Sequence, residues 1–518
     1  MLNLQKDLER YNNIKRRAFK AEKENKFEKA LDYAWVAATF ATFVHLGVWF
    51  DNEIEDLLKK VGQEIGRQID QKPLNNSGNH RIVHVLTSFS GIGGHYKVAE
   101  NWIEALDGHC QQFLYMVGET NQHSSDWTKR FGNKVTVRYA SSKLQVNRVK
   151  QLIEILERDK PEKIVLYIHP SDVATVTAIN GLKNKPHVIF FNHFDHFWVG
   201  RNIVDQLIEW RQESLKYTKK YRQLDVMSVI PLTIDVKKIT YDKAIVKKEL
   251  HIPSEATVSV TVAKKEKVVG DKNWDYYETI KDILMQNPNH YHISVSTPQK
   301  PLNNPDLDKR FITIPRTSQV SYYYSAADFL IESFPAIGGT VLTEAMAYKL
   351  PILKINNKQF SLYSSSDALP ENYPIQASSK EEVIKQAKQL IIDSNLRAKL
   401  SSDVLLDFNS FFDFEKIRKI IVETVLHSAP SKLEIADCSY DVEYLYSVSK
   451  IASQFSPSRE AISYASKKPA FSLLERIAFY RDGAKNGEFT LRMKIKELAL
   501  AFMGYKTRAF VSKFFKRF

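Results

Sequence analysis

Apolar runs that suit buried strands alternate with amphipathic stretches through the first large part of the chain. The first run, RIVHVLTSF from Arg81, leads into a glycine-bearing loop and then into the helical pattern HYKVAENWIEAL. Similar pairs follow, with helical patterns such as VNRVKQLIEILERDK between the apolar runs CQQFLYMVG, KVTVRYA, KIVLYIH and HVIFFNH. This alternation predicts βα units and a parallel sheet that is covered by helices on both faces.

A second set of βα units follows a crossover segment that is punctuated by Pro231 and Pro253. Its apolar runs are ATVSVTV, YHISVSTP, RFITIPRT and ILKINN, with helical patterns such as DYYETIKDIL and EEVIKQAKQLIID among them. We therefore predict an α/β fold with two Rossmann-like domains, at residues 80–240 and 250–428.

The two ends of the chain have helical composition and carry no strand pattern. Residues 1–70 are predicted to form an accessory helical segment, in which alanines at helical spacing let helices approach closely. A turn-rich linker, QKPLNNSGNH, separates this segment from the first Rossmann-like domain. Residues 429–518 are predicted to form a second helical region that ends in a basic amphipathic helix.

Composition narrows the compartment and the partners of the protein. The 518 residues carry a formal net charge of +14, which favours an anionic partner such as a nucleotide or an anionic membrane, and only two cysteines, which fits a reducing compartment. The N-terminus lacks the apolar core of a secretory signal. The long uncharged stretch from Ala34 to Phe50 is short for a membrane span and is interpreted as a buried helix hairpin. We expect a cytoplasmic protein.

The last residues combine bulky apolar and basic side chains. In TLRMKIKELALAFMGYKTRAFVSKFFKRF, leucine, isoleucine and phenylalanine fall on one helical face among lysines and arginines. This pattern is typical of an interfacial membrane anchor, although a solvated terminal helix packed on the core would also show it. We predict peripheral contact of residues 490–518 with an anionic surface, at the inner face of the cell membrane.

One stretch, IESFPAIGGTVLTEAMAYKLPIL, implies a chemistry. A strand end meets Glu332, a loop with Gly338 and Gly339, and then a helical run. The N–H groups at such a helix start favour a phosphate, and the glycines allow close approach of the backbone. Thr340 is expected to cap the helix, and Glu344 to accept hydrogen bonds from ribose hydroxyls. The alternative is an ordinary capped helix.

The longer segment YYYSAADFLIESFPAIGGTVLTEAMAYKLPIL resembles the donor-binding segment of GT-B glycosyltransferases. The resemblance implies two Rossmann-like domains that face a cleft, with the diphosphate and ribose of a nucleotide sugar held by this segment. Two departures stand out. Lys349 replaces the glycine of the family, and Glu332 and Glu344 are further apart than the paired glutamates of retaining members. The stereochemical outcome therefore stays open.

The same resemblance implies further donor contacts. The glycine loop after the first strand is an incomplete dinucleotide fingerprint on its own, but it resembles the loop that approaches the donor in GT-B enzymes. A basic loop after ATVSVTV resembles the place where these enzymes neutralise the diphosphate, although its lysines could equally be solvated surface residues. The loop after RFITIP resembles the nucleobase contact. The residues assigned in this way are Gly93, Gly94, Lys264, Lys272, Ile314 and Arg316.

The segment FNHFDHFWVG gathers two imidazoles and a carboxylate at the end of a predicted strand. A histidine beside an aspartate can act as a general base, so His193, Asp195 and His196 are catalytic candidates. A structural cluster and a metal pair are the alternatives, and the lack of a third ligand at suitable spacing disfavours metal. The segment also resembles a stretch that lines the sugar and acceptor site in some bacterial glycosyltransferases.

These patterns predict a glycosyltransferase that moves a sugar from a nucleotide-diphosphate sugar to a growing cell-surface polysaccharide or glycoconjugate. The nucleotide sugar is a substrate, and no cofactor or metal is expected. The acceptor could be a glycan, a lipid-linked glycan or a protein, and no nucleic-acid-binding module is apparent. The alternatives are a protein glycosyltransferase and a non-catalytic GT-B-like partner subunit of another glycosyltransferase.

Overall fold

The chain forms two compact units. The computed structural model describes residues 3–71, 80–87, 94–118, 131–194, 196–232, 241–264, 267–268, 275–297, 302, 304–360, 362, 369–370, 372–427, 437–453, 468 and 470–485. The first unit comprises Met1–Gly91, Asp107–Leu207 and Leu445–Phe518, and the second comprises Ile92–Leu106 and Ile208–Tyr444.

The first sheet has seven strands in the order β3-β2-β1-β4-β5-β6-β7. The pairs among its first five strands are parallel. Strands such as β1 and β4 are buried almost throughout, as expected for a parallel sheet covered on both faces. The strands are β1 (Arg81–Leu86), β2 (Gln111–Val117), β3 (Thr136–Ala140), β4 (Lys163–Tyr167), β5 (His187–Asn192), β6 (Gln206–Glu209) and β7 (Met227–Val229).

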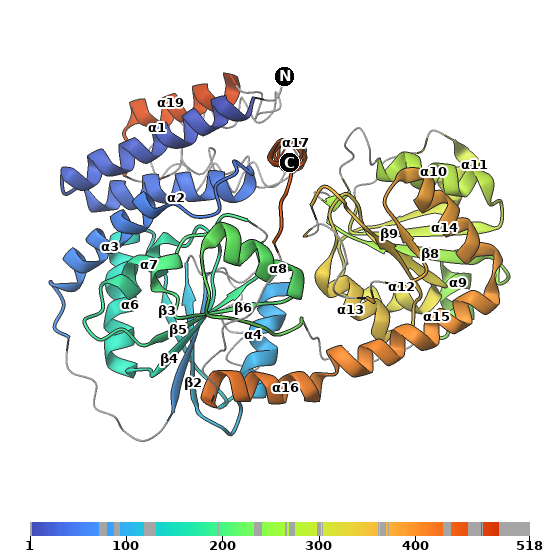
Figure 1. Ribbon diagram of the computed structural model, residues 1–518, viewed down its shortest axis with the longest axis horizontal. Helices are drawn as coiled ribbons and strands as arrows, with labels where there is room; N and C mark the ends of the chain where they lie inside the picture. The colour runs from blue at the N-terminus through green and yellow to red at the C-terminus, as the bar shows by residue number, and fades with distance from the viewer. Residues whose placement is uncertain are drawn as a thin grey trace. The chain divides into compact units, whose positions relative to one another are not determined.

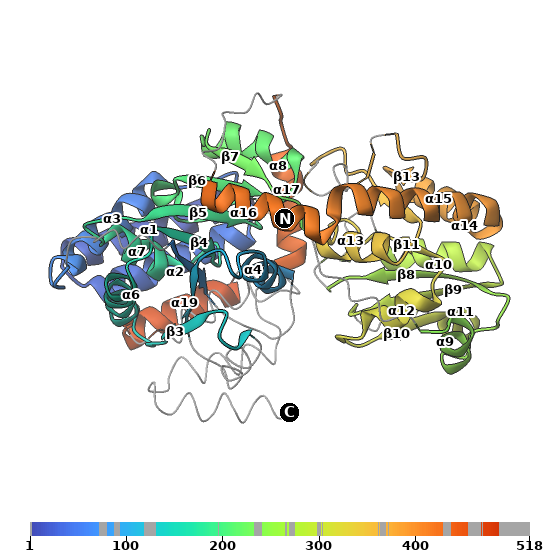
Figure 2. The same cartoon turned by 90° about the horizontal axis from the view of Figure 1, so that it is seen from below.

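The second sheet has six strands in the order β10-β9-β8-β11-β12-β13, and its pairs are parallel. Figure 2 shows β13, β11, β8, β9 and β10 following one another down the sheet. The strands are β8 (Thr257–Val262), β9 (His290–Val295), β10 (Phe311–Ile314), β11 (Phe329–Ile331), β12 (Ile352–Ile355) and β13 (Gln376–Ala377). Two sheets of parallel strands with helices confirm the predicted fold class.

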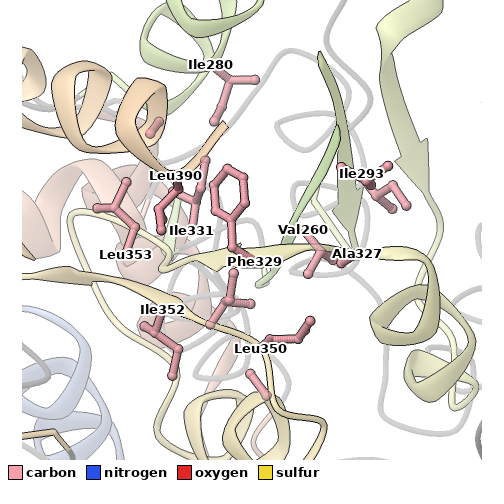
Figure 3. Packing of buried hydrophobic residues seen from close by; sticks show 14 of the residues in the cluster. Val260, Ile280, Ile293, Ala327, Phe329, Ile331, Leu350, Ile352, Leu353 and Leu390 are labelled. Carbon is pink, nitrogen blue, oxygen red and sulfur yellow. The ribbon is translucent and has the colours of Figure 1, made fainter. Parts of the chain in front are cut away.

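The core of the second unit lies between this sheet and its helices. Val260, Phe329 and Ile352 from the strands are fully or almost fully buried, and Ile280 and Leu390 cover them from two helices (Figure 3). Helices α10 and α14 lie on one face of the sheet and α12 and α13 on the other (Figure 1). The bounds are α9 (Lys243–Glu249), α10 (Tyr276–Gln286), α11 (Pro305–Arg310), α12 (Val320–Ala326), α13 (Gly339–Ala347) and α14 (Lys380–Ile392).

Helices from both ends of the chain form one layer in the first unit. Arg10 in α1 pairs with Asp482 in α19 at 2.7 Å, and Asp7 in α1 pairs with Lys450 in α17 at 2.9 Å. Figure 1 shows α19 lying along α1. The two ends were predicted as separate segments, and they pack together. The helices are α1 (Leu4–Lys23), α2 (Phe27–Phe43), α3 (Asn52–Gly66), α17 (Val442–Ser453) and α19 (Leu473–Lys485).

Several elements differ from the sequence-based expectation. The uncharged run from Ala34 does not form a helix hairpin, because α2 ends at Phe43 and the following residues up to Asp51 are not helical. Strands β6 and β13 were not foreseen. No helix in the described part of the chain is long and apolar enough to cross a membrane. The remaining helices are α4 (Gly94–Ala105), α6 (Gln145–Asp159), α7 (Val173–Asn180), α8 (Gln212–Tyr217), α15 (Ser394–Asp407) and α16 (Phe414–Val422).

Candidate functional site

The loops that follow β8, β10 and β11 lie at one edge of the second sheet. Because the paired strands are parallel, their carboxyl ends meet at the same edge, where open α/β sheets bind ligands. Lys264 follows β8 and is exposed, Ile314 ends β10 and is half-buried, and Arg316 in the next loop is exposed. The fold therefore brings these predicted donor-site residues to the edge that carries Glu332 and Gly339.

Helix α13 begins at this edge without a side-chain cap. Its N-cap residue is Gly338, and Gly339 is its first residue. The prediction that Thr340 caps the helix is wrong, because the helix starts one residue before Thr340 and encloses it in the first turn. The backbone carbonyl of Thr340 instead accepts a hydrogen bond from Thr343 Oγ1 at 3.0 Å. With a glycine as N-cap, the first N–H groups of α13 suit an anion.

A lysine that sequence reasoning missed stands beside this helix start. Lys267 Nζ donates a hydrogen bond to the carbonyl of Ile337. A Cβ built on Gly338 would lie 3.9 Å from the same ammonium nitrogen. Lys267 belongs to the basic loop in which Lys264 and Lys272 were singled out, and only the loose spacing hid it. Lys272 lies outside the described residues.

Glu344 lies one turn into α13 in a mostly buried environment. Tyr324 in α12 donates its hydroxyl to Glu344 Oε2 at 3.2 Å. Burial raises the pKa of the Glu344 carboxyl, while the charge of Lys97 and the Tyr324 hydrogen bond act in the opposite direction. A carboxyl group held in this way can accept hydrogen bonds from hydroxyl groups in either protonation state.

Glu332 has a structural partner at the end of β12. Its side chain is 3% exposed, and Oε2 accepts a hydrogen bond from the backbone N–H of Ile355 at 2.7 Å. This bond fixes the loop after β11 against the neighbouring strand. Its predicted contact with the donor stays a prediction.

An apolar cavity of about 340 Å³ in the second unit adjoins Gly339. A Cβ on Gly339 would lie 3.0 Å from the ring of Trp210 and 3.1 Å from Leu232 Cδ1. Any side chain at residue 339 would therefore force these neighbours to move. The other lining residues include Val229, Pro231, Ile337, Leu342, Phe411 and Phe412.

The second predicted cluster lies in the first unit, directly after β5. His193 is half-buried, and its Nδ1 is 3.4 Å from the carbonyl oxygen of Phe191. The ring of His196 lies 4.8 Å from the ring of the fully buried His45, which belongs to the N-terminal helical segment. Asp195 lies outside the described residues. The catalytic assignment of all three stays a prediction.

Other predicted contacts fall at the margin of the described chain. Gly94 is the first residue of α4, and Gly93 lies outside the described residues, as do residues 490–518. Among the residues that the structure describes, no cluster of three or more His, Cys, Asp or Glu side chains could hold a metal ion.

Comparison with known proteins identifies the fold. No protein-family model matches the chain, and no curated protein matches it. Among solved structures, Alr3699/HepE from Anabaena, crystallised with UDP and glucose, is 14% identical with a TM-score of 0.52, over 67% of this chain and 99% of that one. A glycosyltransferase from Rickettsia africae is 11% identical with a TM-score of 0.53, over 68% and 100% of the two chains.

Sucrose-phosphate synthase from Thermosynechococcus elongatus is also similar, at 13% identity and a TM-score of 0.51, over 67% of this chain and 98% of that one. At these identities the likeness concerns the fold. The chain therefore has the two-sheet GT-B fold of these glycosyltransferases.

Proposed function

We propose that the protein is a glycosyltransferase that moves a sugar from a nucleotide-diphosphate sugar to a cell-surface polysaccharide or glycoconjugate acceptor. The observation that carries this proposal is the start of α13, where Gly338 leaves the helix without a side-chain cap and Lys267 stands beside it. This arrangement suits a diphosphate. The shared fold with nucleotide-sugar transferases supports the same assignment.

Each part of the donor has a proposed partner at this edge of the sheet. The first N–H groups of α13 and the ammonium group of Lys267 bind the diphosphate, with Lys264 and Lys272 adding positive charge. Glu344 accepts hydrogen bonds from the ribose hydroxyls, and Tyr324 fixes its carboxyl group. The loop after β10, with Ile314 and Arg316, contacts the base.

The transfer breaks the bond between the anomeric carbon and the diphosphate oxygen, and forms a bond from that carbon to an acceptor oxygen. The acceptor hydroxyl gives up its proton to His193, which acts as general base. The bonding electron pair stays on the diphosphate oxygen, so the nucleoside diphosphate leaves with one more negative charge, which the helix start stabilises. No cofactor or metal is assigned to this step, because backbone N–H groups and lysines supply the positive potential.

The acceptor is proposed to be a glycan or a lipid-linked glycan, with a protein acceptor as the alternative. The predicted basic and apolar tail at residues 490–518 supports a lipid-linked acceptor, since it would bring the enzyme to the inner face of the cell membrane. A non-catalytic partner subunit is the remaining alternative.

A donor panel tests the proposal. The protein is incubated with UDP-, GDP- and TDP-sugars, and the release of nucleoside diphosphate and the donor dissociation constants are measured. We expect G339V and E344A to lose about tenfold or more in donor affinity, whereas E415Q, at an exposed glutamate in the first turn of α16, should match the wild type. Absence of release with every donor, or wild-type donor affinity in G339V, would overturn the proposal.

A further inference from the structure

The segment from His193 to Asn202 is held by the N-terminal helices through its residues from His196 to Asn202. It connects β5 to β6 in the first unit and carries the proposed general base. Phe197, Trp198 and Val199 in this segment are 1% exposed, so the covering is close. The covering residues come from α1, α3 and the turn between α2 and α3, which are far away in the sequence.

Glu55 in α3 makes the central contact. Its Oε1 accepts hydrogen bonds from the backbone N–H of Gly200 at 2.6 Å and of Arg201 at 3.3 Å, and its Oε2 accepts one from Asn202 N–H at 3.4 Å. The side chain is 3% exposed. Gly200 has φ of 109°, a conformation that only glycine adopts readily, so a sharp turn is fixed at this point. One carboxylate therefore holds successive N–H groups of the turn.

Ring contacts hold the rest of the segment. The rings of Tyr11 and Phe197 meet edge to face with centroids 6.5 Å apart, and the guanidinium group of Arg201 lies 4.7 Å from the ring centroid of Phe50. The contact between His45 and His196 lies one residue before Phe197 in the segment. Three separate parts of the N-terminal segment thus converge on the residues that follow His193.

Helix α3 is itself fixed at both ends, so it can serve as a rigid support. At its start, Asp51 caps the helix and accepts hydrogen bonds from Tyr11 and Lys15, both at 2.8 Å. At its end, the backbone of Gly66 meets Gly181 so closely that a Cβ would lie 2.1 Å from the Gly181 carbonyl oxygen. Figure 1 shows α3 beside α7, the helix that Gly181 ends.

We propose that Glu55 is a positioning residue for the reaction, holding the His193–Asn202 segment in the geometry in which His193 meets the acceptor. The proposal rests on the proposed function. It gives the N-terminal helices a role in turnover that an accessory packing element would not have. Glu55 touches no substrate and acts only through the backbone of the segment.

The charge state of Glu55 supplies a readout that packing alone would not give. Burial raises the pKa of its carboxyl group to about 7, while the backbone N–H groups and Arg201 act in the opposite direction. The charge of Glu55 also contributes to the raised pKa of Tyr11, in which burial is the largest cause. Because folding raises this pKa, ionisation of the buried carboxyl weakens the folded arrangement, so the segment is held most firmly below about pH 7.

Glu28 provides a matched control in the same helical layer. Its carboxylate oxygens accept hydrogen bonds from the backbone N–H groups of Gln145 and Val146, both at 2.8 Å, at the start of α6. Burial also raises the pKa of Glu28. Both glutamates thus accept hydrogen bonds from successive backbone N–H groups of the first unit. Glu28 differs in that it binds the start of α6, which does not carry His193.

The experiment compares E55Q, E55A, E28Q and E28A in the full chain. Donor dissociation constants, turnover with the donor found in the panel, melting temperature, and hydrogen exchange at residues 199–203 are measured. We expect E55A to lower turnover by about 10- to 100-fold with donor affinity unchanged and exchange accelerated at these residues. E28A should lower the melting temperature and leave turnover unchanged. Protection of residues 199–203 against hydrogen exchange should fall as the pH rises through about 7 in the wild type, and E55Q, which keeps its Oε1 contacts, should lack that fall.

Two outcomes overturn the positioning role alone: wild-type turnover in both Glu55 variants, or equal losses of turnover in E55A and E28A at matched loss of stability. A wild-type protein that releases no nucleoside diphosphate from any donor overturns the proposed function instead, and the positioning role falls with it.

Discussion

Acidification from about pH 8 to about pH 5 should destabilise the second unit by about 4 kcal/mol through two buried histidines. His290 and His292 lie in β9 and are at most 1% exposed. Ser259 Oγ bridges them, at 2.8 Å from His290 Nε2 and 2.7 Å from His292 Nδ1. The outer ring nitrogens meet Thr257 Oγ1 at 3.0 Å and the hydroxyl of Tyr276 at 2.8 Å.

Hydroxyl groups surround both rings, and no carboxylate is among the partners named for them, so the neutral form is favoured. Burial lowers the pKa of His290 from 6.5 to about 3, with the charge of Arg310 acting in the same direction. Burial also lowers the pKa of His292 well below its usual value, and the charge of His290 adds to this effect.

The sign follows from proton uptake. The unfolded chain binds a proton on each histidine below about pH 6.5, and the folded unit does not, so folding loses free energy as the pH falls. At about 1.4 kcal/mol for each pH unit, a drop to about pH 5 costs about 2 kcal/mol for each ring. This loss is a large fraction of the stability of an ordinary domain, about 5–15 kcal/mol.

Urea unfolding at the two pH values, with H290Q as the test variant, measures the effect. H290Q removes one ring, so about 2 kcal/mol of the acid-induced loss should disappear, whereas H251N, at an exposed histidine of the same unit, should keep the wild-type loss. If H290Q unfolds at both pH values, the ring protons of the wild type are followed by NMR, and no titration of either ring is expected above about pH 5. Equal losses in H290Q and wild type, or a ring that titrates near pH 6.5, would refute the reasoning.

Three further changes have expected outcomes. The free energy of unfolding of E55Q should exceed that of wild type by about 3 kcal/mol at about pH 8 and equal it at about pH 4. The reason is that the raised pKa of Glu55 costs stability only once the carboxyl is ionised. Chemical denaturation at both pH values measures the difference, and equal free energies of unfolding at pH 8 contradict it. K349G should raise the unfolding free energy by about 1 kcal/mol and K349A should not, since Lys349 has φ of 61°. A higher unfolding free energy in K349A would show that removal of the lysine charge, and not relief of backbone strain, causes the gain. G66A should cost about 3 kcal/mol, because its Cβ would lie 2.1 Å from the carbonyl oxygen of Gly181, and an unchanged melting temperature would show that α3 and α7 can move apart.

The parallel sheets could be predicted from the sequence because the central strands, such as β1, β4 and β8, are buried on both faces. The run KIVLY in β4 carries its signal in consecutive apolar residues, and TVSVTV in β8 carries it in β-branched valines and threonines. The short elements carried a weaker sequence signal. Strand β13 has two residues and α11 has six, which is too little for any period to show.

Contacts between distant residues could not be predicted at all. Glu55 and Gly200 are separated by 145 positions, and neither residue type indicates that the other will be its hydrogen-bond partner. The helical layer made from both chain ends has the same origin, since Arg10 and Asp482 are 472 positions apart. For this reason the sequence identified His193 as a candidate but did not predict that the N-terminal helices contact the segment that follows it.

The start of α13 shows where residue type alone misleads. Threonine is a good N-cap, so Thr340 was the natural expectation, but the helix takes Gly338 as its cap and includes Thr340. A glycine cap provides no side-chain acceptor for the first N–H groups of the helix. The change of cap from Thr340 to Gly338 therefore strengthens the prediction of an anion site. The lysine beside this helix start, Lys267, lies in the predicted basic loop but at a different position from Lys264 and Lys272.

The other end of α13 explains the departure at Lys349. The helix ends in a Schellman motif, with Lys349 N–H bound to Met346 O and Leu350 N–H bound to Ala345 O, both at 3.0 Å. This motif needs a left-handed residue, and glycine adopts that conformation at no cost. Lys349 adopts it with φ of 61° and keeps both hydrogen bonds, at about 1 kcal/mol of strain. The glycine in the family pattern therefore reflects a left-handed backbone conformation at this position, which this chain adopts with a lysine. The departure does not count against a donor site at the opposite end of the same helix.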